Sequence, residues 1–191
     1  MSFINSKEKE INCKIAYVGA AFSGKSTSLH HIYEKTVSGK HGKMVSLSEK
    51  DGTLYFDFLP LSLGKVNGYT IRFHLYTVPG QFFHESARKM ILKGVDGVVF
   101  VVDSRVERLE DTLKSWKNLQ ENLKFNDIDF QTAPIVLQYN KQDLKNLVPA
   151  EELNQLLNQK NLPSFESIAT QGKQVMECFQ SLAKSVLKTI K

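Results

Sequence analysis

Apolar residues along the chain recur with two periods: a period of two, typical of β-strands, and steps of three and four, typical of helices. Strands are predicted at residues 11–18, 53–63, 69–76, 95–103, 135–139 and 165–168. Helices are predicted at residues 26–35, 85–93, 107–124, 150–158 and 175–190. Because strands alternate with helices, the pattern predicts an α/β fold.

The sheet is expected to be mostly parallel, with helices on both faces. The unbroken apolar run at residues 98–102 is typical of a strand buried on both sides. Residues 64–68 end in the Asn-Gly signal of a hairpin, which adds one antiparallel edge strand. Residues 36–52 are predicted to connect the first helix to the next long strand, and this connection contains one short strand at 44–47. We therefore expect a six-stranded sheet in a single domain over residues 1–191.

A phosphate-binding loop is predicted directly after the first strand. Residues 19–26 read Gly-Ala-Ala-Phe-Ser-Gly-Lys-Ser, the Gly-x-x-x-x-Gly-Lys-Ser pattern of a P-loop. Its backbone N–H groups and the positive end of the next helix would surround phosphate, whereas the alternative is a plain glycine-rich turn. Lys25 is expected to reach the β- and γ-phosphates, and the Ser26 hydroxyl to hold Mg²⁺. The predicted nucleotide contacts here are Gly19, Ala20, Ala21, Phe22, Ser23, Gly24, Lys25, Ser26 and Thr27.

A second motif, Asn140-Lys141-Gln142-Asp143, follows the buried strand at 135–139. A carboxylate has two acceptor oxygens, and guanine offers two adjacent donors where adenine does not. Asp143 is therefore expected to select guanine, while Asn140 binds the ring and Lys141 lies along it. A polar turn is the alternative interpretation, but the P-loop upstream disfavours it. Ligands bind beyond the carboxyl ends of strands in such sheets, and both motifs lie there.

With these motifs, nearly the whole chain resembles the small Ras-like P-loop GTPases, and more narrowly the bacterial MglA group of gliding-motility and cell-polarity GTPases. Thr77-Val-Pro-Gly-Gln81 matches the switch II motif, with Thr77 in place of the usual aspartate. The resemblance also rests on Asn5 and on residues 11–15, 32–36, 56–60, 72–81 and 92–100.

The resemblance implies a guanine-nucleotide switch with GTP, GDP and Mg²⁺ as its ligands. Thr53 would join Ser26 at the metal, Gly80 would sense the γ-phosphate, and Gln81 would orient the attacking water beside Lys25. Ala169 and Thr170 would complete the nucleotide-binding residues. The implied partners are a roadblock-type GTPase-activating homodimer and effectors of polarity or motility.

Two departures from the family pattern predict slow intrinsic hydrolysis. Ala21 stands where a glycine is frequent, and Gly52 stands where the group carries an internal arginine finger. Such a finger contributes about 10³- to 10⁵-fold in rate. The candidates to replace it are Arg72, Arg88, Arg105 and Arg108. A nucleotide-binding polarity scaffold with negligible turnover is the alternative function, and an ATP-using P-loop kinase is disfavoured by Asp143.

Composition adds little beyond these motifs. The net charge of +5 comes from scattered lysines, so we expect no nucleic-acid role. No apolar run is long enough to span a bilayer, and we find no secretory leader and no lipidation signal. We therefore expect a cytoplasmic protein without a direct membrane anchor, which partners can enrich at a cell pole.

Overall fold

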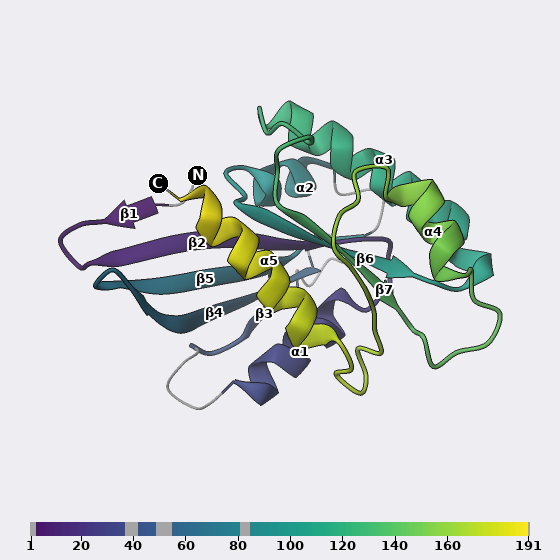
Figure 1. Cartoon of the computed structure of the whole chain (residues 1–191), viewed down its shortest axis with the longest axis horizontal. Helices are drawn as coiled ribbons and strands as arrows, with labels where there is room; N and C mark the ends of the chain where they lie inside the picture. The colour runs from purple at the N-terminus through teal and green to yellow at the C-terminus, as the bar shows by residue number, and fades with distance from the viewer. Residues whose placement is uncertain (1–2, 37–41, 49–54, 81–84, 191) are drawn as a thin grey trace.

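A mixed β-sheet forms the centre of the computed structural model, which describes residues 3–36, 42–48, 55–80 and 85–190 (Figure 1). Its strands run in the order β3-β4-β5-β2-β6-β7-β8, and β1 pairs with β2. The strands are β1 (Phe3–Asn5), β2 (Glu10–Val18), β3 (Val45–Ser48), β4 (Tyr55–Val66), β5 (Tyr69–Thr77), β6 (Gly97–Asp103), β7 (Ile135–Asn140) and β8 (Ser164–Glu166).

The predicted α/β class is correct, but the strand count needs a correction. The described residues form eight strands where a six-stranded sheet is predicted. β3 corresponds to the short strand predicted at 44–47 and joins the sheet antiparallel to β4, whereas the short antiparallel strand β1 was not predicted. β3 lies outside β4, so β4 is not the edge strand. β1 is too short to show a period, and a turn joins it to β2. In that turn the Asn5 side chain accepts N–H bonds from Lys7 and Glu8.

The predicted hairpin between β4 and β5 is present, but its turn is shorter than expected. β4 continues to Val66, and Gly64 (φ 106°) lies within it, where the pairing register shifts between Ser62 and Lys65. The turn itself consists of Asn67 and Gly68, which both have positive φ. That backbone is typical of the type I′ turn, which suits the twist of a hairpin.

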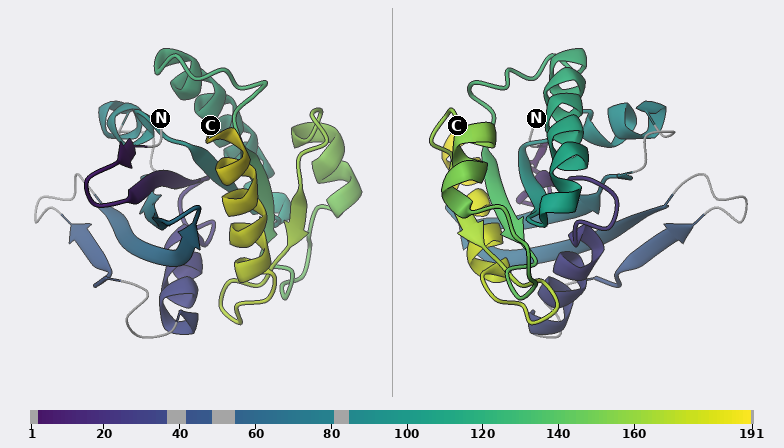
Figure 2. Two further views of the ribbon diagram at one scale, coloured as in Figure 1. Left: turned by 60° about the vertical axis from the view of Figure 1, so that its left-hand side comes forward. Right: turned by 90° about the vertical axis from the view of Figure 1, so that its right-hand side faces the viewer.

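Helices cover both faces of the sheet (Figure 2). They are α1 (Lys25–Lys35), α2 (Glu85–Leu92), α3 (Leu109–Phe125), α4 (Ala150–Leu157) and α5 (Val175–Thr189), with a short 3₁₀ helix η1 (Val106–Arg108) before α3. Leu29 of α1 and Phe179 of α5 pack into one core, on the same face as Tyr17 of β2. Trp116 of α3 and Leu153 of α4 pack into the other core, on the opposite face. Within the described segments, no helix combines the length and apolarity that a membrane crossing needs.

Five neighbouring strands run parallel, so their carboxyl ends meet at one edge. β2 pairs in parallel with β5 and β6, β6 with β7, and β7 with β8. The segments that leave this edge contain the P-loop, Thr77, Asp103, Asn140 and Ala169. The sheet therefore brings together residues that lie far apart in the sequence.

Candidate nucleotide-binding site

The P-loop glycines are required by close contacts with neighbouring segments. Gly19 and Gly24 have φ values of 153° and 107°. A Cβ atom on Gly19 would lie 2.2 Å from the Val101 carbonyl oxygen, and one on Gly24 would lie 2.1 Å from the Asn140 amide nitrogen. The loop then enters α1, whose N-terminal end carries the positive part of the helix dipole.

Lys25 is buried within the curl of the P-loop. Its Nζ donates hydrogen bonds to the carbonyl oxygens of Gly19 (2.9 Å) and Ala20 (2.7 Å). Burial, together with the smaller effect of the Lys141 charge, lowers the pKa of Lys25 to about 7, against the attraction of Asp57. A cation in this position is stabilised when anionic phosphate oxygens replace the lost water.

Asn140 joins three loops of the site. Its Nδ2 donates to the Ser23 carbonyl oxygen (2.7 Å). Its Oδ1 accepts from the Ala169 backbone N–H (2.9 Å) and from the Ser167 hydroxyl (3.1 Å). All four residues are buried, so these hydrogen bonds hold the P-loop, the guanine motif and the 167–170 loop in one fixed arrangement.

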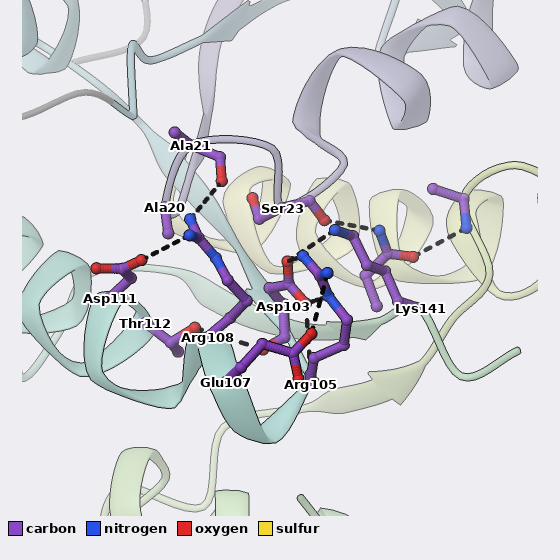
Figure 3. Close-up of polar contacts among 12 residues, drawn as sticks. Ala20, Ala21, Ser23, Asp103, Arg105, Glu107, Arg108, Asp111, Thr112 and Lys141 are labelled. Atoms are coloured by element: carbon purple, nitrogen blue, oxygen red, sulfur yellow. Dashed lines mark hydrogen bonds and ion pairs between the residues drawn. The ribbon is translucent and has the colours of Figure 1, made fainter. Parts of the chain in front are cut away.

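Asp103, at the end of β6, orients the lysine of the guanine motif (Figure 3). The Lys141 ammonium donates to its Oδ2 at 2.7 Å. Arg105 binds both carboxylate oxygens, at 3.0 and 2.9 Å. Burial opposes ionisation of Asp103, but the Arg105 and Lys141 hydrogen bonds outweigh it, so its pKa lies below the ordinary value. Sequence reasoning did not single out Asp103, although an acidic residue that ends an apolar strand is a usable signal.

A second carboxylate missed by the sequence analysis, Asp57, lies fully buried on β4. β4 and β5 pair antiparallel with Phe58 opposite Tyr76, which places Asp57 across from Thr77. The Thr77 hydroxyl donates to Asp57 Oδ2 (3.2 Å) and accepts from the Asp57 N–H (2.7 Å). The Ser46 hydroxyl donates to Oδ1 (2.7 Å). An acidic side chain therefore lies beside Thr77, the residue that replaces the switch II aspartate.

Gly80 lies against the P-loop. A Cβ atom at Gly80 would come within 2.5 Å of the Ala21 backbone nitrogen and 2.6 Å of the Ala20 carbonyl carbon. Val78, two residues earlier, donates its N–H to the Tyr17 carbonyl oxygen (2.9 Å), which extends the β2–β5 pairing toward the loop. The backbone of switch II therefore approaches the P-loop as closely as glycine allows.

The other predicted site residues differ in exposure. Ser26 and Thr27 are half-buried at the start of α1, and Ala169 is buried. Asp143 and Thr170 are exposed at the same edge of the sheet. Phe22 has a positive φ of 64° and an exposed fraction of 81%. Two predicted residues, Thr53 and Gln81, lie outside the described residues, and so does Gly52.

The candidate arginines are distributed over different parts of the molecule. Arg72 forms an ion pair with Glu10, on the strands β5 and β2. Arg105 is engaged with Asp103. Arg88 of α2 is buried and lines a pocket together with Gly19 and Gly80. Arg108 forms a hydrogen bond with the P-loop, because its Nη2 donates to the Ala21 carbonyl oxygen at 3.1 Å.

Comparison with known proteins identifies the family of this chain. The sequence profile of the ADP-ribosylation factor family matches residues 1–188. The chain belongs to this family. It is a small GTPase, as the P-loop and guanine motif predict. The predicted resemblance to the MglA group is also confirmed, because the chain is 52% identical over 192 residues to the mutual gliding-motility protein MglA of Myxococcus xanthus. That match covers 100% of this chain and 98% of the relative.

Two further relatives belong to other branches of small GTPases. Ras-related protein Rab-5B of Plasmodium falciparum is 25% identical over 183 residues, which cover 96% of this chain and 82% of the relative. Human ADP-ribosylation factor-like protein 4A is 35% identical over 102 residues, which cover 51% of this chain and 47% of the relative. Both are less similar to this chain than the Myxococcus MglA, whose identity is 52%.

Proposed function

We propose that this GTPase is a slow guanine-nucleotide switch that acts in cell polarity or motility, and that residues 1–191 form its single domain. The observation that carries the proposal is the Asn140 junction. Three hydrogen bonds of one buried side chain connect the phosphate loop to the base-reading loops. A ligand with a phosphate chain at one end and a guanine at the other fits both ends of this junction.

The phosphate end is assigned to the P-loop amides and Lys25. The Lys25 ammonium, which now contacts the loop carbonyls, would turn to the β- and γ-phosphate oxygens. We assign Gly80 to the γ-phosphate and Gln81 to orienting the attacking water, so that hydrolysis depends on positioning and charge stabilisation.

The proposed metal is Mg²⁺, and the oxygen donors near the P-loop suit it. Mg²⁺ prefers a few protein oxygens together with substrate phosphates over an all-protein cage. Among the described residues, no three His, Cys, Asp or Glu side chains are grouped so as to hold a metal by themselves. Ser26 and Thr53 would bind the ion, and Asp57 would hold its water ligands. When bound, Mg²⁺ neutralises charge that develops on the β- and γ-phosphate oxygens.

Base selection is assigned to Asp143, and its test is a competition measurement. The carboxylate is exposed and available to the two adjacent donors of guanine. We expect Asp143→Ala to lose the preference for GDP over ADP, whereas a surface control, Asp127→Ala, retains it. If the Asp143 variant still discriminates between the purines, the assignment of the guanine site is wrong.

Slow hydrolysis separates the switch from the alternative, a nucleotide-binding polarity scaffold. Ala21 and Gly52 favour a low intrinsic rate, and the proposed partner is a roadblock-type homodimer. Single-turnover GTP hydrolysis, measured with and without such a partner, distinguishes the two functions. We expect slow turnover that the partner accelerates. Turnover of several GTP molecules per second without a partner contradicts slow hydrolysis. If no GTP is hydrolysed even with the partner, the scaffold function is favoured.

The role in polarity or motility is proposed from the name of the Myxococcus relative. Under this proposal the protein is cytoplasmic, acts through effectors, and is enriched at a pole through its partners. The test is complementation of a Myxococcus strain that lacks MglA. We expect the wild-type chain to restore gliding and the Lys25→Met variant not to restore it. If the folded wild-type chain restores no gliding at all, the shared role is contradicted.

A further inference from the structure

Arg108 connects the start of α3 to the P-loop, although 87 positions separate it from Ala21 in the sequence (Figure 3). Its Nη2 donates to the Ala21 carbonyl oxygen at 3.1 Å. Its Nη1 forms an ion pair with Asp111, one turn further along α3, at 2.9 Å. Its Nε is buried, and no hydrogen-bond acceptor for it lies within the described part of the chain. The guanidinium therefore contacts the loop, while its buried Nε–H donor finds no acceptor among the described residues.

Ala21 is in contact with switch II on another side. The backbone of Gly80 packs against the Ala20–Ala21 peptide so closely that a Cβ atom at Gly80 would lie 2.8 Å from the Ala21 Cα. A change in the position of the Ala21 peptide therefore changes the space available to Gly80. Arg108 and Gly80 act on the same short stretch of backbone.

The hydrogen bond from Arg108 also acts on the donors of the loop. A charged donor at the Ala21 carbonyl polarises the peptide that this carbonyl shares with the Phe22 N–H. P-loop N–H groups are the contacts to phosphate, so polarisation strengthens a donor of the site. Phe22 has a strained positive φ of 64°, and a hydrogen bond at the preceding carbonyl helps to hold this conformation.

We propose that Arg108 is a positioning residue for the GTP-bound state. It holds Ala21 where Gly80 can close on the γ-phosphate, and it thereby couples α3 to switch II. This inference rests on the proposed function, since Gly80 is the group assigned to the γ-phosphate. Its signature is selectivity: GDP has no γ-phosphate, so loss of the Arg108 contact affects GTP more than GDP.

The test compares Arg108→Gln and Arg108→Lys with a matched arginine, Arg72→Gln, whose ion pair with Glu10 joins the strands β5 and β2. Affinities are measured with fluorescent GDP and a non-hydrolysable GTP analogue. We expect Arg108→Gln to weaken binding of the GTP analogue about tenfold, the size of one charge-assisted hydrogen bond. GDP binding should weaken less than about threefold. Arg108→Lys should bind the GTP analogue more tightly than Arg108→Gln does, but less tightly than the wild type. Arg72→Gln should change neither affinity.

Two results would overturn the inference. Equal weakening for both nucleotides would mean that Arg108 only supports the fold, and unchanged affinities would mean that the contact has no role. Thermal unfolding of each variant identifies a folding defect, and the lysine variant keeps the test available if glutamine disrupts the packing. Failure of the wild-type protein to prefer guanine nucleotides would instead reject the proposed function, so the two outcomes are distinguishable.

Discussion

Nucleotide binding should be coupled to proton uptake at Lys25. Burial lowers the pKa of this ammonium to about 7 before nucleotide binds, against the attraction of Asp57. Phosphate oxygens placed beside Nζ favour the charged form and raise the pKa again. Binding of GDP above neutral pH must therefore draw a proton from solution, whereas binding below neutral pH draws almost none.

The magnitude follows from the pKa of about 7. At pH 8 about one tenth of the free protein carries the Lys25 proton, so saturation with GDP takes up about 0.9 proton. At pH 6 about nine tenths are already protonated, and the uptake falls to about 0.1. Each pH unit above 7 should then weaken GDP binding up to about tenfold, or about 1.4 kcal/mol.

The same shift affects the stability of the nucleotide-free protein, with a defined sign. The folded pKa lies below the unfolded value of 10.5, so the unfolded chain binds more protons between pH 7 and 10.5. Stability against unfolding therefore rises with pH across this window. Below pH 7 the cost of burying the charge is fully present, on the order of 5 kcal/mol.

Isothermal titration calorimetry measures the uptake directly. GDP is titrated at pH 8 in HEPES and in Tris buffer, and at pH 6 in MES and in Bis-Tris buffer, because the two buffers of each pair differ in ionisation enthalpy. Lys25→Arg is the matched control because arginine stays protonated, and it also corrects for protons exchanged by the GDP phosphates. A binding enthalpy at pH 8 that is the same in both buffers for the wild-type protein would refute the reasoning.

Two further predictions concern the buried polar groups of the site. Asn140→Asp keeps the acceptor for Ala169 but replaces the donor to the Ser23 carbonyl with a charged oxygen, so urea unfolding should show a loss of about 2–4 kcal/mol and GDP should dissociate faster. A stability equal to that of the wild type contradicts this result. Asp57→Asn should raise by about tenfold the Mg²⁺ concentration that slows GDP dissociation. An unchanged Mg²⁺ dependence would exclude Asp57 from the metal site.

Local patterns were sufficient for the helices, for the long strands and for both motifs. The α1 helix begins at Lys25 and β7 ends at Asn140, each within one residue of the boundary predicted from the P-loop and the run of apolar residues. These features depend on neighbours within a few positions, where glycine freedom and apolar periodicity act directly. The shorter hairpin turn was missed because a bulge at Gly64 interrupts the alternation that marks β4.

The sequence by itself determined that this chain is an α/β GTPase, and it predicts Lys25 as the phosphate contact and Asp143 as the guanine contact. Only the tertiary structure decided which side chains support them. Asp57 faces Thr77 because β4 and β5 pair in one register, and Arg108 reaches Ala21 because α3 packs beside the P-loop. Such contacts depend on strand register and helix packing across distant parts of the chain, which leave no mark in the spacing of residues.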